Sequence, residues 1–184
     1  MSAAARSASS VGVAGPLLFA SGVLAAIGIA FLIAMFVSFA AGATAAGQAF
    51  GRVNDILIMV AYPLAIPGIL GLRALLRPHA PVGSAIAASI GIVAIGAIVV
   101  LQALLVGERL TFEEQVGPVT LALFALGASL VTTGYLGRAS GALSDGLRMG
   151  LIGATYFGYP IWAVWARRRL LSSTRAVRVQ IREE

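Results

Sequence analysis

The sequence predicts an all-α membrane protein: a polytopic helical bundle of about five transmembrane helices with a basic C-terminal tail. The first observation is composition. Of 184 residues, 59% are hydrophobic and 11% are charged, whereas soluble domains carry about 25% charged residues. The second is length, because several apolar runs exceed the roughly 20 residues that a helix needs to cross a hydrocarbon core of about 30 Å. The third is that arginines gather at the ends of these runs and in the tail.

The predicted organisation is one membrane bundle, residues 16–169, between two short flanking segments. Residues 1–15 are small and polar and are expected to be a flexible N-terminal segment, and residues 170–184 an interfacial or cytoplasmic tail. The first apolar run is longer than the 7–15 residues of a signal peptide, which predicts an uncleaved span. A small-residue loop is expected at 41–53, and the predicted spans are about 16–40, 54–76, 82–106, 118–136 and 148–166.

The second span is the least ordinary, because Pro63 and Pro67 lie four residues apart near its middle. Each proline removes a backbone N–H and presses on the carbonyl four residues earlier. Freed carbonyls inside a membrane must be met by neighbouring helices, side chains or trapped water. The span is therefore expected to be kinked or partly unwound, and to pack inside the bundle.

Two groups of polar residues are candidates for ligand binding. Asn54 and Asp55, beside Arg52, stand at the mouth of the second span and suit a polar headgroup or a cation. The structural alternative is that Asn54 caps the helix and Asp55 favours its N-terminus. The second group would line a midplane cavity around the proline break, as discontinuous helices do in transporters. Its chief members are Tyr62, Pro63, Pro67, Gln102 and Tyr156, and it also includes Tyr135 and Tyr159. The alternative for these tyrosines is a packed ring or an interfacial belt.

The most polar loop, Gly107–Val116, carries three of the seven acids. Glu108, Glu113 and Glu114 could form an acidic rim that holds a divalent ion or serves as general acid and base. Alternatively the loop is solvated and Thr111 with Glu114 forms a capping box. A short turn that breaks at Pro118 is an equal possibility.

Small residues at a spacing of four run along several spans and predict close helix crossings, because dispersion and close backbone approach drive association in lipid. One row lies on the first span, at Gly22, Ala26, Ala30, Ala34 and Ser38. Another lies on the fifth, at Gly146, Gly150, Ala154 and Gly158, and three of its four members are glycine. Such rows suit contacts within the bundle, in a homo-oligomer or with a membrane-protein partner.

Several chemistries are disfavoured. The chain has no cysteine and no lysine, and His79 is its single histidine. Thiolate chemistry, a lysine Schiff base and bis-histidine haem ligation are thereby excluded, and no cofactor and no metal site are expected. The spans as drawn contain no central charge, which disfavours an ion-driven pump. The net charge of +6 does not indicate nucleic acid, because the arginines stand where anionic lipid headgroups would meet them, above all Arg167, Arg168 and Arg169.

Five spans place the termini on opposite sides. A cytoplasmic C-terminus puts eight arginines inside and five outside, which the positive-inside rule favours. Without the tail the count reverses to two against five.

Three phrases carry a family resemblance and together cover about half of the chain: GRVNDILIMVAYPLAIPGILGLRALL, LTFEEQVGPVTLAL and TGYLGRASGALSDGLRMGLIGATYFGYPIWAVWARRRL. The chain resembles the small multi-pass membrane proteins of unknown function found in actinobacteria and other GC-rich bacteria. The resemblance implies a protein of the bacterial cytoplasmic (inner) membrane and supplies no catalytic residue.

The functional expectation is a non-enzymatic integral membrane protein with an accessory, scaffold or lipid-binding role, within an oligomer or complex. The first alternative is a small-molecule transporter or binding protein built around the proline-broken second span. The second is an intramembrane enzyme that uses the Glu108–Glu114 loop.

Overall fold

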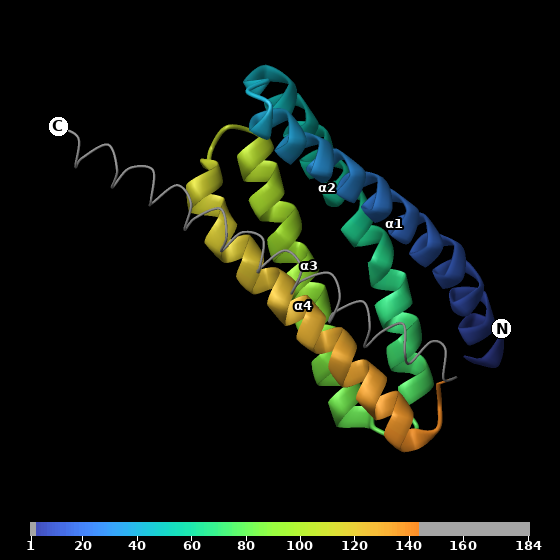
Figure 1. The fold of residues 1–184 in the computed structure, drawn as a ribbon. Coiled ribbons are helices and arrows are strands. Elements are labelled where there is room, and N and C mark those ends of the chain that lie inside the picture. The colour runs from blue at the N-terminus through green and yellow to red at the C-terminus, as the bar shows by residue number, and fades with distance from the viewer. Residues whose placement is uncertain (1–2, 144–184) are drawn as a thin grey trace.

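The computed structural model describes residues 3–143, with side chains from Pro16 onward. Within this range the chain forms four helices: α1 Ala3–Ala40, α2 Thr44–Leu76, α3 Pro81–Val106 and α4 Phe112–Ser140. Successive helices run in opposite directions (Figure 1). Each contains a stretch long and apolar enough to cross a membrane. The predicted fifth span and basic tail lie outside the described residues.

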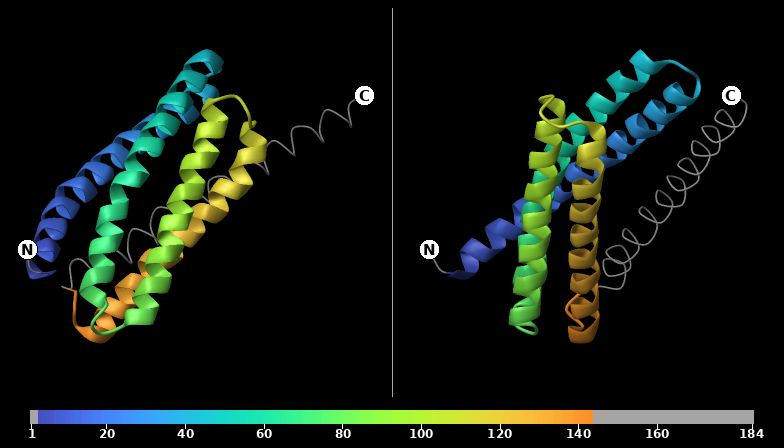
Figure 2. Two further views of the ribbon diagram at one scale, coloured as in Figure 1. Left: turned by 180° about the vertical axis from the view of Figure 1, so that it is seen from behind. Right: turned by 90° about the vertical axis from the view of Figure 1, so that its left-hand side faces the viewer.

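The four helices form an open, curved layer (Figure 2). α1 packs against α2, α2 against α3, and α3 against α4, with a minor contact between α2 and α4. Among these helices, α1 touches neither α3 nor α4. Most of each helix is therefore left uncovered, as the exposed apolar side chains Phe19, Ile33, Val93 and Leu121 show. Such surfaces suit lipid, in which they cost nothing to expose.

The predicted ends of the first three spans match the structure, whereas the starts of the first, second and fourth helices and the end of the fourth do not. The first span ends at Ala40 and the third covers Pro81–Val106, as expected. α1 already begins at Ala3, within the predicted N-terminal segment 1–15. The predicted loop at 41–53 is wrong: Gly42, with a φ of +77°, makes the turn, and α2 starts at Thr44. Alanine-rich sequence has high helix propensity, so the helices continue beyond the apolar core.

The start of α4 is set by a capping box. The Thr111 hydroxyl accepts a hydrogen bond from the Glu114 N–H at 3.3 Å, and the Glu114 carboxylate accepts one from the Thr111 N–H at 2.8 Å. The helix therefore begins at Phe112 and runs through Pro118 without a break. Pro118 has no N–H to donate, so the Glu114 carbonyl lacks its helical hydrogen-bond partner. Glu114 is exposed, so water can satisfy this carbonyl.

α2 remains helical through Pro63 and Pro67, so the predicted unwinding does not occur. The helix instead bends along its length (Figure 2). α1 lies beside it from Gly47 to Gly68, and its second half also packs against α3. Proline at two positions one turn apart accounts for a bend of this kind.

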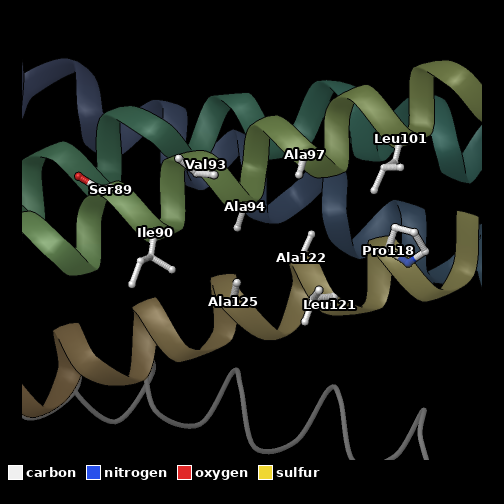
Figure 3. Close-up of a pocket in the computed structure, with 10 residues that line it drawn as sticks. All are labelled: Ser89, Ile90, Val93, Ala94, Ala97, Leu101, Pro118, Leu121, Ala122 and Ala125. Atoms are coloured by element: carbon white, nitrogen blue, oxygen red, sulfur yellow. The ribbon is translucent and has the colours of Figure 1, made fainter.

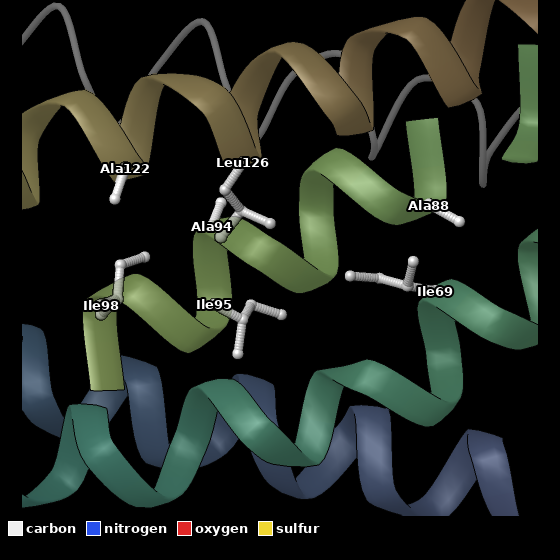
Figure 4. Packing of buried hydrophobic residues seen from close by; sticks show 7 residues of the cluster. All are labelled: Ile69, Ala88, Ala94, Ile95, Ile98, Ala122 and Leu126. Carbon is white, nitrogen blue, oxygen red and sulfur yellow. The ribbon is translucent and has the colours of Figure 1, made fainter. Parts of the chain in front are cut away.

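The apolar core lies where α2, α3 and α4 meet (Figure 4). Its buried members are Ile69, Ala88, Ala94, Ile95, Ile98, Ala122 and Leu126. Tyr62 and Ile66, which immediately precede Pro63 and Pro67, are partly buried against this cluster. The prediction that this part of α2 packs inside the bundle is therefore confirmed.

The crossing of α3 and α4 depends on Gly91. A Cβ atom at this position would lie 2.7 Å from the Ser129 Oγ and 3.3 Å from the Ile69 Cδ1. The close approach lets the Ser129 hydroxyl donate to the Ala87 carbonyl at 2.7 Å, although both groups are buried. A small residue thus permits an interhelical hydrogen bond that hydrocarbon could not replace.

The small-residue rows differ in their surroundings. On α3, Ala87 and Gly91 are buried, and on α4, Ser129, Thr133 and Gly137 are buried. On α1, by contrast, the first three members of the row, Gly22, Ala26 and Ala30, are exposed. α1 contacts α2 through a neighbouring face that contains Ser21, Gly28 and Met35. The Gly146–Gly158 row lies beyond the described residues.

Alanine at Gly91 should lower stability, whereas alanine at Gly96 should raise it. Both glycines are in α3, but a Cβ at Gly96 meets nothing within 4 Å. Gly96→Ala should therefore gain about 0.5–1 kcal/mol from helix propensity. Gly91→Ala should lose about 1–3 kcal/mol from overpacking at the crossing. Thermal unfolding in one detergent measures both, and equal gains for the two variants would contradict the crossing described above.

Candidate functional site

The two ends of the bundle differ in their loops and charges. At one end lie the turn between α1 and α2 and the loop between α3 and α4 (Figure 1). We call this the cavity end. At the other, the basic end, lie the start of α1, the turn at 77–80 and the end of α4.

A recess of about 800 Å³ opens at the cavity end. This interfacial cavity lies between the α1–α2 hairpin and the α3–α4 loop. The cavity brings together two groups of residues that the sequence did not connect. One is Arg52 and Asp55 at the mouth of the predicted second span, and the other is the Glu108–Glu114 loop. The lining residues are Met35, Phe36, Phe39, Gln48, Gly51, Arg52, Asp55, Leu105, Val106, Glu108, Arg109, Leu110, Thr111, Phe112, Glu113 and Glu114.

The lining is amphipathic. Apolar side chains, chiefly Met35, Phe36, Phe39 and Phe112, form one part of the wall. Charged side chains form another, namely the carboxylates Asp55, Glu108, Glu113 and Glu114 and the guanidinium groups Arg52 and Arg109. Four acids against two bases give this lining a formal charge of −2. The aromatic side chains of the wall could not be predicted from the sequence, because Phe36 and Phe39 belong to the end of α1 and reach the cavity only through the α1–α2 hairpin.

One ion pair connects the two sides of the cavity. The Arg52 Nη2 of α2 donates to the Glu108 Oε1 in the α3–α4 loop. Both side chains are largely exposed, so the pair adds little to the free energy of unfolding. Its effect is local: it fixes the loop beside α2 and leaves Arg109 and the other carboxylates at the opening.

Glu108 has an unusual backbone conformation. α3 ends in a Schellman motif, in which the Glu108 N–H donates to the Leu105 carbonyl at 3.0 Å and the Arg109 N–H to the Leu104 carbonyl at 2.8 Å. This motif needs a left-handed residue after the cap, and glycine is the usual choice. Glu108 occupies the position with a φ of +56°. Non-glycine residues in this region are strained and are concentrated at functional sites.

Asn54 and Asp55 lie in the interior of α2, because the helix begins at Thr44. The interpretation of Asn54 as a helix cap is therefore wrong. Asn54 is buried against α1, where a Cβ at Gly28 would lie 3.3 Å from its Oδ1. Its Nδ2 donates to the Asp55 Oδ1 at 3.4 Å, which helps to orient a half-buried carboxylate that lines the cavity.

The three glutamates of the loop have different surroundings. Glu108 pairs with Arg52, and Glu114 is used by the capping box, where the Thr111 hydroxyl also donates to it at 3.0 Å. Glu113 is exposed at the cavity. Among residues 16–143, no three His, Asp or Glu side chains come close enough together to hold a metal ion. The acidic-rim interpretation therefore gains no support from the geometry of this loop.

Gln102 does not join Tyr62 in a midplane cavity. Its Oε1 accepts a hydrogen bond from the Gln115 Nε2 of α4 at 3.0 Å, and both side chains are buried. Tyr62 packs on the apolar core, Tyr135 is exposed, and Tyr156 lies outside the described residues. Gln115 could not be predicted from the sequence, because no pattern shows which helix faces Gln102.

A second recess, of about 480 Å³, is an apolar groove between α3 and α4 (Figure 3). Its residues are Ser89, Ile90, Val93, Ala94, Ala97 and Leu101 of α3 and Pro118, Leu121, Ala122 and Ala125 of α4. Ser89 is the only polar side chain among them. The groove therefore offers nothing to orient a polar ligand, and its surface suits acyl chains.

No known protein family matches this chain, and neither a curated protein nor a solved structure is similar to it.

Replacing one member of the buried amide pair should destabilise more than replacing both. Gln102→Leu or Gln115→Leu strands a buried amide, which costs about 1–3 kcal/mol. The double variant removes both polar groups and should recover part of that loss. Urea or thermal unfolding of all four proteins in detergent gives the coupling energy. Strict additivity of the two single losses would show that the amides do not interact.

Proposed function

We propose that this chain is a non-enzymatic integral membrane protein that binds an amphiphile in the interfacial cavity, in a lipid-binding or accessory role. The observation that supports the proposal is the convergence of three elements on one opening: the end of α1, the mouth residues of α2 and the α3–α4 loop. The carboxylates and guanidinium groups would contact a headgroup, and the aromatic side chains would contact the first part of an acyl chain.

The ligand class follows from the charges of the lining. A net charge of −2 favours a headgroup that carries a cationic amine, and carboxylates accept hydrogen bonds from ammonium groups. Aromatic faces nearby add cation–π attraction. Arg109, which has no ion pair among the described residues, suits a phosphate. A zwitterionic phospholipid such as phosphatidylethanolamine provides both groups in one molecule.

The glutamate at the end of α3 also supports a binding role. Glycine would satisfy the Schellman motif at lower cost, yet this chain places a carboxylate there and pairs it with Arg52. A strained residue that contributes little to stability is better explained by what it presents to the cavity. The transporter alternative has less support, because Tyr62 packs against the apolar core beside the prolines.

The setting of the proposal is the bacterial inner membrane, as the family resemblance implies, and an oligomer or complex. The exposed Gly22, Ala26 and Ala30 face of α1 is a surface on which another membrane helix could pack closely. Native mass spectrometry of the protein released from mild detergent reports both a retained lipid and the oligomeric state.

Filling the cavity should displace the lipid. Gln48→Trp places an indole in the lining, whereas Ala45→Trp places one on an exposed part of the same helix that does not line the cavity. With phosphatidylethanolamine titrated into the detergent, we expect the apparent Kd of the lipid to rise about tenfold for Gln48→Trp, a loss of about 1.4 kcal/mol in binding. Equal retention by the two variants would contradict binding in this cavity.

Glu108→Gly should weaken lipid binding without lowering the thermal stability of the protein. Glycine relieves the left-handed strain and removes an exposed ion pair of small energy, so thermal stability should stay unchanged or rise by up to about 1 kcal/mol. Retention of phosphatidylethanolamine should fall, because the loop loses its tie to Arg52. A variant that loses stability and keeps the lipid would show that Glu108 is structural.

A further inference from the structure

Asp55 differs from the other three carboxylates that line the interfacial cavity. Glu108 is paired with Arg52. Glu114 is held by the capping box, and Glu113 is exposed. Of the four, Asp55 is the one that is half-buried. Water therefore compensates its charge less than it compensates the charge of the other three.

Asp55 also lacks the cation that its place in α2 would provide. Arg52 precedes it by three residues, a spacing at which opposite charges on a helix are neighbours. The Arg52 guanidinium instead donates to Glu108 across the cavity, which leaves Asp55 without an ion pair among the described residues. The side chain that donates to Asp55 is the neutral amide of Asn54, at 3.4 Å. A partly desolvated carboxylate with so little compensation is costly, and a bound cation would offset that cost.

We propose that Asp55 accepts a hydrogen bond from the ammonium group of the bound amphiphile, and that this contact makes the cavity selective for amines that carry N–H groups. The inference rests on the proposed function, because it names the residue that recognises the headgroup in the same cavity. A primary ammonium has three N–H donors, whereas a trimethylammonium group has none. Phosphatidylethanolamine should therefore bind more tightly than phosphatidylcholine.

The remaining features of the cavity attract both headgroups. Phe36, Phe39 and Phe112 line the wall, and aromatic faces attract quaternary as well as primary ammonium groups. The formal charge of −2 acts on any cation in the same way. A directional hydrogen bond is what distinguishes the two lipids. Asp55 is best placed to accept it, because a charge-assisted hydrogen bond is stronger where water is partly excluded.

Asn54 orients this carboxylate. Its side chain is buried against α1, where a Cβ at Gly28 would lie 3.3 Å from its Oδ1. Its Nδ2 donates to the Asp55 Oδ1, so the Asp55 Oδ2 is left to accept from a ligand. Asn54 is therefore a positioning residue, which acts on the ligand through Asp55.

Native mass spectrometry of the full-length protein, with phosphatidylethanolamine or phosphatidylcholine titrated into mild detergent, tests the inference. For the natural chain we expect an apparent Kd about tenfold lower for phosphatidylethanolamine, the factor that one charge-assisted hydrogen bond provides. Asp55→Asn should abolish this preference. Glu113→Gln is the matched control, because it removes one negative charge from the same lining. It should weaken both lipids by a similar factor and keep the preference.

Asn54→Ala should reduce the preference although Asp55 keeps its charge, because the carboxylate loses its orientation. A purely structural role for Asn54 would lower the melting temperature and leave the ratio of the two Kd values unchanged. That result would overturn the positioning role.

The outcomes separate this inference from the proposed function. If the natural chain binds neither lipid, the proposed function is wrong and the inference falls with it. If it binds both equally, or if Asp55→Asn keeps the preference, the cavity binds an amphiphile but Asp55 does not select it. The natural chain also gives a test without substitution: N,N-dimethyl phosphatidylethanolamine keeps one N–H and should bind more tightly than phosphatidylcholine. Equal binding of these two lipids would contradict recognition through an N–H group.

Discussion

The close crossing of α3 and α4 at Gly91 is the contact on which the packing of these two helices with α2 depends. In hydrocarbon, helices gain little by hiding apolar surface from lipid, so backbone proximity and interhelical hydrogen bonds must hold them together. Gly91 brings the Ser129 hydroxyl to the Ala87 carbonyl, and the Gln102–Gln115 hydrogen bond fixes the same pair nearer the cavity end. These two polar contacts set the register of α3 against α4. The register in turn determines where the α3–α4 loop meets α2.

α2 joins the two halves of the layer, because it contacts helices on both sides. It packs on α1 as far as Gly68, where a Cβ would lie 3.0 Å from the Leu18 Cδ1, and the next residue, Ile69, belongs to the core with α3 and α4. Pro63 and Pro67 precede this shared contact, and Tyr62 beside them packs against the core. The opening between the diverging hairpins at the other end is the interfacial cavity.

Sequence patterns predicted the existence of the four described helices well, because an apolar run of membrane length has one stable solution in lipid. They failed where the chain leaves the hydrocarbon, at 41–53 and before Pro118, since capping and propensity decide helix ends there. Asn54 was misassigned for the same reason. The sequence predicted the polar residues of the cavity only as two separate clusters, at the mouth of the second span and in the Glu108–Glu114 loop. Its assembly depends on helix register and on the left-handed Glu108, and neither leaves a signal in hydrophobic periodicity.

Charge and cavity chemistry lead to one physical picture of the molecule in a membrane. The exposed Arg73, Arg77 and Arg138 lie at one end of the described bundle, and the acidic lining lies at the other. Anionic headgroups would be attracted to the first end and repelled by the second. A zwitterionic or cationic amphiphile would therefore be favoured over an anionic lipid in the interfacial cavity, because Asp55 and Glu113 repel anionic headgroups. The ligand preference that we propose thus follows from the distribution of charge along the bundle.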